Sequence, residues 1–187
     1  MAQRQVGLDP CCHRSEKQRF RLQLSTGKLH SYVTAKVEFT LSKPYEGDFP
    51  ITQFFGENPD FYSQFTYDGV PLRGKEGVDI GLPTGINVLA TDDGVVQSVD
   101  FVPGGAGNYL KIQHQWGESV YTQLDEVTVS VGQTIKKGDI IAISGNTGAA
   151  TGPHLGFRIR IYPYDRADGW GGFSDPAPFS PWMIISR

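Results

Sequence analysis

The segment from Thr151 to Phe157 carries the residues whose types and spacing are best suited to chemistry. Residues two apart in a β-strand point to the same face, so two histidines at that spacing would direct both imidazoles at one metal ion. Here the first of these positions holds His154 and the second holds Gly156. Glycine has no side chain and cannot bind a metal. The spacing therefore predicts a zinc-type site that lacks one ligand.

Short strands between tight turns are expected to position this segment. The chain contains 23 glycines and 12 prolines and few long runs of helix-forming residues. This pattern predicts an all-β, mainly antiparallel sheet folded on itself, with little helix beyond a turn or two near residues 60–65. Residues 163–187 are predicted to wrap the sheet as an ordered coil. The predicted strands are 87–90, 94–101, 108–114, 119–124, 139–144 and 154–162.

The N-terminal part differs from the rest in charge and in pattern. Residues 1–18 are predicted to be a disordered basic arm, 19–43 a β-hairpin extension with alternating apolar residues, and 44–187 the main domain. Residues 1–36 carry seven Lys/Arg and two Asp/Glu, whereas residues 37–187 carry ten and eighteen. The basic part could contact a polyanion or be a solvated arm. It lacks interleaved aromatic residues, so no nucleic-acid partner is expected.

Composition places the chain among soluble globular proteins. It has 187 residues, of which 39% are apolar and 20% charged, enough for one domain with a substantial core. No apolar run approaches the roughly 18 residues of a membrane span, and the first 30 residues lack the apolar core of a secretory signal. Cys11 and Cys12 are adjacent and are interpreted as free thiols; with His13 they would make only a partial metal site.

Several motifs, in order along the chain, resemble the lysostaphin/LytM-type zinc endopeptidases, which cut peptide cross-links in bacterial peptidoglycan. Residues 77–80 and the turn at 83–85 resemble the first metal motif of that family, and residues 90–96 resemble its next hairpin. Residues 104–114 resemble its glycine turn and central strand, and residues 131–141, 144–148 and 151–154 lead into the second metal motif. The resemblance covers roughly residues 50–160. It implies a lysostaphin/LytM-like folded β-sheet of the duplicated-hybrid-motif type.

The resemblance also implies which positions would surround zinc. The family binds the ion through a His-x-x-x-Asp pair and the second His of His-x-His, positions that are here Lys75, Asp79 and Gly156. Two further histidines of the family correspond to His154 and Gln123. Asp79 is thus a remnant ligand, His154 a remnant catalytic residue, and Gln123 a replacement that cannot act as a base near neutral pH. No cofactor is expected, although the family uses zinc.

Lys75 would put a positive charge where the charge of zinc would lie. An ammonium group has three donors and no lone pair, so we hypothesise that it pairs with Asp79 and takes over the structural role of the cation. The alternatives are that Lys75 extends into solvent and that Asp79 caps a turn. Glu76 and Glu118 could rebuild a shifted metal site, although their spacing does not require one. His114 is interpreted as structural.

Aromatic residues near the motifs suggest a groove for an extended peptide, which could bind by main-chain hydrogen bonds and side-chain pockets. Tyr109 and Trp116 are the candidate substrate contacts. Further aromatic candidates occur before the first motif and in the tail: Phe54, Phe55, Phe61, Tyr62, Phe65, Tyr67, Trp170 and Phe173.

Three functions stay open on these grounds. The ligand count favours a pseudoenzyme, which would bind a cell-wall peptide or another envelope polymer or act as a regulatory module. The alternatives are an active zinc endopeptidase with a remodelled metal site and a structural component of a wall- or phage-associated assembly. The resemblance implies a cell-envelope or extracellular location, even though no signal peptide is visible. The sequence does not indicate an oligomeric state.

Overall fold

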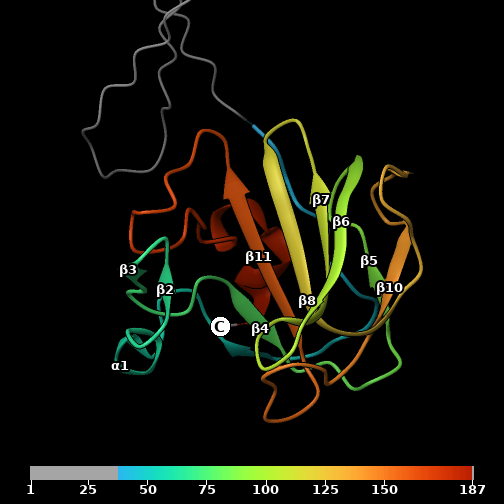
Figure 1. Cartoon of the computed structure of the whole chain (residues 1–187). Helices are drawn as coiled ribbons and strands as arrows, with labels where there is room; N and C mark the ends of the chain where they lie inside the picture. Colours follow the sequence, from blue (N-terminus) through green and yellow to red (C-terminus); the bar gives the residue numbers. More distant parts are fainter. Residues whose placement is uncertain (1–37, 187) are drawn as a thin grey trace, which may run out of the picture. The chain divides into compact units, whose positions relative to one another are not determined.

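Short antiparallel strands make up most of the regular structure between residues 38 and 186, the part of the chain that the computed structural model describes (Figure 1). The strands are β1 (Ile51–Gln53), β2 (Thr66–Tyr67), β3 (Val70–Pro71), β4 (Val78–Ile80), β5 (Asn87–Leu89), β6 (Gly94–Val102), β7 (Gly107–Gln113), β8 (Gly117–Val127), β9 (Thr134–Ile135), β10 (Ile140–Ser144) and β11 (Leu155–Ile161). The helices are α1 (Pro59–Tyr62) and the 3-10 turns η1 (Ala177–Phe179) and η2 (Pro181–Ser186).

Nine of these strands form one sheet in the described part of the chain. The main path of the sheet runs β1-β4-β11-β8-β7-β6-β9, and β10 pairs with both β5 and β8. The pairs are antiparallel, and β2 and β3 form a separate small ribbon. The longest strands, β6, β7, β8 and β11, lie side by side (Figure 1). The prediction of a mainly antiparallel β-fold with little helix is confirmed.

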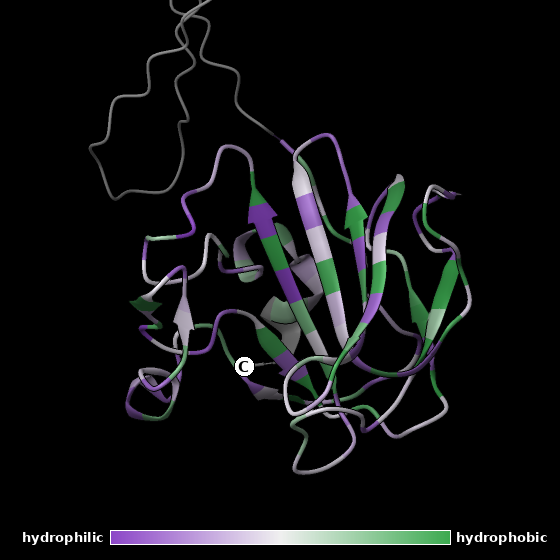
Figure 2. Ribbon diagram, in the orientation of Figure 1, coloured by the Kyte–Doolittle hydropathy of each residue, from purple (hydrophilic) through white to green (hydrophobic). Residues whose placement is uncertain are grey.

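The side chains of β11 point alternately into the core and toward the opposite face of the sheet. Leu155, Phe157 and Ile159 are fully buried, whereas the residues between them are glycine or arginine. This alternation is visible as bands of different hydropathy along β11 in Figure 2. Burying a large apolar side chain contributes about 1.5–3 kcal/mol, so these three residues fix which face of β11 points inward. The intervening side chains must therefore point into the groove.

The predicted strands correspond closely to the observed ones. Those predicted at 87–90, 94–101, 108–114, 119–124, 139–144 and 154–162 are β5, β6, β7, β8, β10 and β11, respectively, and the helical turn expected near residues 60–65 is α1 at Pro59–Tyr62. The tail after β11 includes the 3-10 turns η1 and η2. Ser174 donates its backbone N–H to the Ile159 carbonyl at 2.9 Å, which ties the tail to the sheet.

The predicted arm at residues 1–18 and most of the predicted hairpin at 19–43 lie outside the described residues. The described end of that hairpin contains no strand: Leu41 is buried and its N–H bonds to the Phe179 carbonyl at 2.8 Å. Within residues 38–186, none of the helices combines the length and the apolarity that crossing a membrane would require.

Candidate functional site

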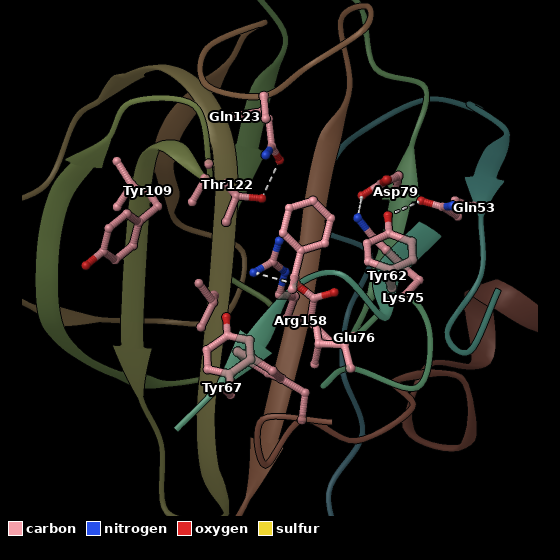
Figure 3. Close-up of a pocket in the computed structure, with 18 of the residues that line it drawn as sticks. Gln53, Tyr62, Tyr67, Lys75, Glu76, Asp79, Tyr109, Thr122, Gln123 and Arg158 are labelled. Atoms are coloured by element: carbon pink, nitrogen blue, oxygen red, sulfur yellow. Dashed lines mark hydrogen bonds and ion pairs between the residues drawn. The ribbon is translucent and has the colours of Figure 1, made fainter. Parts of the chain in front are cut away.

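A groove of about 720 Å³ lies over the polar face of the sheet, a volume typical of ligand-binding sites. Strand register explains why the candidate residues meet there. Asp79 on β4 is opposite Gln53 on β1 and Gly156 on β11, and Gly156 is opposite Thr122 on β8. Directly opposed residues point to the same face of a sheet. The two predicted metal positions on β4 and β11 are therefore adjacent, as Figure 3 shows for Asp79 and Thr122 beside β11.

Lys75 occupies the centre of this site. Its Nζ lies 2.7 Å from Asp79 Oδ1, and the two side chains are only 7% and 13% exposed. This ion pair (Figure 3) is the one that we hypothesised from the sequence, and the alternative in which Lys75 extends into solvent is wrong. The loop that carries Lys75 is fixed by backbone hydrogen bonds: the Lys75 N–H donates to the Glu57 carbonyl, and the Gly56 N–H donates to the Lys75 carbonyl, both at 2.9 Å.

The surroundings of Lys75 act on its pKa in opposite directions. Burial and the neighbouring Arg158 lower the pKa of the ammonium, and Asp79 opposes this shift. The Lys75 Nζ also lies 5.7 Å from the ring centroid of Tyr62, within cation–π range. The Tyr62 hydroxyl donates to Gln53 Oε1 at 2.7 Å, and burial, with Asp79 and Glu76 nearby, raises the Tyr62 pKa.

Thr122 and Gln123 fill the space beside Gly156. Gln123 has a φ of 60°, a left-handed conformation that is uncommon for residues other than glycine. Both side chains line the groove, although successive residues of a regular strand face opposite sides. The Thr122 hydroxyl donates to Gln123 Oε1. A Cβ added to Gly156 would clash with Thr122 Oγ1 and lie 2.6 Å from Gln123 Oε1 and 3.4 Å from Asp79 Oδ1.

His154 stands at the edge of the same site. Its Nδ1 lies 2.9 Å from the Gly152 carbonyl, and because a carbonyl only accepts, Nδ1 must be the donor. Its Nε2 then faces Asp79 Oδ1 at 3.9 Å. The imidazole thus neighbours the Lys75–Asp79 pair without completing a set of ligands. In the described part of the chain no three His, Cys, Asp or Glu side chains are grouped so as to hold a metal ion.

The carboxylates that could have rebuilt a metal site are both engaged by arginines. Glu76 Oε1 lies 3.0 Å from Arg158 Nη1, and Glu118 Oε1 lies 2.6 Å from Arg160 Nη1. Arg160 Nε also donates to the Gly171 carbonyl at 2.9 Å. Both pairs are largely buried.

Of the two predicted substrate contacts, one lies in the groove and the other does not. Tyr109 lines the groove, together with the exposed rings of Phe61 and Phe65. Trp116 does not line it: its side chain is 4% exposed, and its Nε1 donates to Asp92 Oδ2 at 2.9 Å. Trp116 is therefore corrected from a substrate contact to a buried residue of the turn between β7 and β8.

His114 is a structural residue, as interpreted from the sequence. It is buried and stacks on Trp116 at 4.6 Å between ring centroids. Its Nδ1 lies 2.7 Å from the Asp93 carbonyl and its Nε2 lies 2.7 Å from Ser119 Oγ. Burial lowers the His114 pKa.

Lys111 and Arg158 also line the groove, and neither was predicted as a site residue from the sequence. The signal for Arg158 was present in the sequence, because it follows Gly156 by two positions and therefore shares its face of the strand. The signal for Lys111 was the same period of two, counted from Tyr109.

Parts of this chain are similar to known peptidases. The family described as Peptidase family M23 matches residues 73–168. An uncharacterized metalloprotease of Haemophilus influenzae is 44% identical over 91 residues, which cover 48% of this chain and 19% of that protein. The peptidoglycan DD-endopeptidase ShyB of Vibrio cholerae is 43% identical over 96 residues, 49% of this chain and 22% of that protein. The chain thus spans about a fifth of the length of these relatives.

A solved structure shares the fold. The crystal structure of a zinc-containing peptidase from Vibrio cholerae superposes with a TM-score of 0.56 at 30% sequence identity, and the match covers 78% of this chain and 43% of that one.

Proposed function

This chain belongs to peptidase family M23, and on that premise we propose that it holds a peptide of the bacterial cell wall in its groove without cleaving it. The family is one of zinc metallopeptidases, and the similar ShyB is by name a peptidoglycan endopeptidase. The family therefore supports the ligand class, and the local chemistry of this chain supports the loss of hydrolysis.

The observation that carries the proposal is the Lys75–Asp79 ion pair. A catalytic zinc needs about three protein ligands and an open position for water. Of the corresponding groups here, the Lys75 ammonium has no lone pair when protonated and Gly156 has no side chain, so Asp79 alone is left, and it is paired at 2.7 Å. These residues do not fit a zinc ion.

The groups that would serve as base or acid in hydrolysis are also poorly suited to it. The amide of Gln123 can donate and accept hydrogen bonds but does not titrate near neutral pH. Glu76 and Glu118 are paired with arginines, which speaks against a remodelled metal site. What the groove retains are hydrogen-bonding groups and aromatic surfaces, including Tyr109, that suit an extended peptide.

The proposed site of action is the cell envelope, because the substrates of the similar endopeptidases are part of the cell wall. The similar segment covers about a fifth of the length of these relatives. The location and the ligand are therefore proposed for this chain from the similar segment alone. The proposed ligand is a peptidoglycan peptide, and the site residues are Lys75, Asp79, Gln123, His154 and Tyr109.

Metal analysis and hydrolysis assays on the purified chain would test the loss of catalysis. We expect substoichiometric zinc after incubation with excess metal, and no release of peptides from purified peptidoglycan. A variant carrying Lys75→His, Gln123→His and Gly156→His serves as the reference for metal uptake. It restores three imidazoles, and the change at Gln123 removes one of the two side-chain oxygens that a side chain at position 156 would meet, the other being the rotatable hydroxyl of Thr122. Tight, stoichiometric zinc in the unmodified chain, with chelator-sensitive cleavage, would refute the proposal.

Cosedimentation with insoluble peptidoglycan would test the binding half of the proposal. We expect the chain to pellet with intact peptidoglycan and not with glycan strands from which the peptides have been removed by an amidase. If the chain failed to pellet with either material, a role as a structural component of an assembly would replace peptide binding.

A further inference from the structure

Half of the lysines and arginines of residues 37–187 line the groove. That stretch contains ten Lys/Arg against eighteen Asp/Glu, so the domain as a whole is acidic. Charges concentrated in a cleft focus the local potential and attract ligands of opposite sign. The cations that line the groove are Lys75, Lys111, Arg158, Arg160 and Arg166.

Strand register puts two of these cations on one row of the sheet. Lys111 on β7 is opposite Val120 on β8, and Val120 is opposite Arg158 on β11. This row lies one step along the groove face from the row of Thr122, Gly156 and Asp79. Strands two apart in a sheet are separated by about 10 Å, a distance that the long side chains of Lys111 and Arg158 can span toward one ligand above Val120.

The carboxylates near Lys111 and Arg158 do not occupy all the N–H donors of these two side chains. Glu118 Oε1 is bonded to Arg160 at 2.6 Å and lies 3.7 Å from Lys111 Nζ, so one carboxylate serves two cations. Arg158 Nη1 lies 3.0 Å from Glu76 Oε1. Its Nε is buried and has no hydrogen-bond partner within residues 38–186. A buried donor without a partner is costly, and Arg158 meets the groove through the 13% of its side chain that is exposed.

We propose that Lys111 and Arg158 form a subsite for a carboxylate of the bound peptide. This rests on the proposed function, because the subsite is part of the same groove. The ligand is an acidic peptide whose carboxylate accepts charge-assisted hydrogen bonds from both side chains. Its apolar atoms contact Phe61 and Phe65, which are 56% and 47% exposed and meet edge to face with their ring centroids 5.5 Å apart.

Charge balance favours a carboxylate over a polyphosphate or a nucleic acid. Lys75, Arg158 and Arg166 each have one carboxylate partner, and Lys111 shares Glu118 with Arg160. Five cations against four carboxylates leave one positive charge, which one carboxylate neutralises. A nucleic acid carries a charge on every phosphate and needs a basic track, whereas the rest of this domain is acidic.

Binding measurements on soluble peptidoglycan fragments would test this subsite. One portion of the fragments is left untreated, and in the other the carboxylates are converted to carboxamides. By isothermal titration calorimetry with the full chain, we expect amidation to weaken binding about tenfold, the loss typical of one charge-assisted interaction. Lys111→Gln should weaken binding of the untreated fragments similarly and have little effect on the amidated ones. Lys136→Gln, which makes the same charge change at an exposed position, should bind as the unmodified chain does.

The outcomes separate this inference from the proposed function. Equal affinity for amidated and untreated fragments would overturn the carboxylate subsite and leave peptide binding intact. Binding of neither portion would contradict the proposed function and the subsite with it. Inorganic polyphosphate is a third arm of the titration, and if it bound as tightly as the untreated fragments, plain attraction of polyanions would replace the subsite.

Discussion

Lys75 shows how one side chain can stand in the place of a divalent ion. A buried carboxylate without a partner is costly, and removing one member of a buried ion pair typically destabilises a protein by several kcal/mol. The Lys75–Asp79 pair is nearly buried, with a separation of 2.7 Å. The ammonium therefore does for Asp79 electrostatically what a bound cation would do, without the Lewis acidity.

Removal of the Lys75 charge should destabilise the chain. We expect Lys75→Met to lower the free energy of unfolding by about 3–5 kcal/mol, because Asp79 loses its partner. The double variant Lys75→Met, Asp79→Asn should recover most of that loss, since no charge is left unpaired. Urea unfolding followed by tryptophan fluorescence measures both.

The matched control for Lys75 is Lys136, whose pair with Asp93 is exposed at 72% and 57% of the two side chains. Exposed pairs contribute little, so Lys136→Met should leave the denaturation midpoint unchanged. If Lys75→Met proved as stable as the unmodified chain, the ion pair would not be a substitute for the cation.

At the scale of the strands, local sequence patterns predicted well which strands exist and in what order they follow along the chain. Glycine turns and alternating apolar residues located β5 to β8, β10 and β11, because those signals are local. They could not supply register, which depends on contacts between strands distant in the chain. The placement of β11 between β4 and β8 is of this kind, and it decides that Gly156 neighbours both Asp79 and Thr122.

The same limit explains which site residues were found. Lys75, Asp79 and Gly156 were identified because they fall within recognisable motifs. Trp116 was misjudged because it lies in a turn, where alternation does not tell which way a ring points. The left-handed backbone of Gln123, which turns its side chain toward Thr122, leaves no signal in the sequence.

The junction of β8 and β11 is expected to depend on Gly117. Its φ is 156°, and an added Cβ would collide with the backbone carbonyl oxygen of Arg160 and lie 3.0 Å from Ile161 Cα. Backbone cannot rotate away as a side chain can, so Gly117→Ala should force the strands apart. We expect a loss of about 3 kcal/mol, measured as a lower midpoint of thermal unfolding. Gly152→Ala is the control, because no heavy atom lies within 4 Å of its added Cβ. An equal effect of both substitutions would show that close packing at Gly117 is not the cause.

At the scale of the whole molecule, one polar network lies on the groove face of the sheet and a separate one surrounds His114. On the groove face, cations and carboxylates are paired in rows. Elsewhere the ring of His114 is buried between the Asp93 carbonyl and Ser119. A charge on that ring would have to form where solvent is largely excluded, which couples the protonation of one side chain to the unfolding of the domain.

This coupling predicts weaker folding in mild acid. Burial lowers the His114 pKa in the folded state, against the opposing effect of Asp93 and Asp92, whereas the unfolded chain titrates near the ordinary value of about 6.5. Above that value the ring is neutral in both states and its contribution is complete. As the pH falls below it, the unfolded state binds a proton first, so the free energy of unfolding decreases until the folded pKa is reached.

We expect urea unfolding to show this loss as the pH falls below about 6.5, at up to about 1.4 kcal/mol per unit of separation between the two pKa values. His114→Gln keeps hydrogen-bonding capacity and cannot titrate, so its stability should change less over the same interval, even though it starts lower. The comparison uses the difference between the two slopes, because the carboxylates common to both proteins cancel. Parallel slopes would mean that the folded environment does not disfavour the imidazolium, and the stacked, buried position of His114 on Trp116 would then have no electrostatic consequence for the domain.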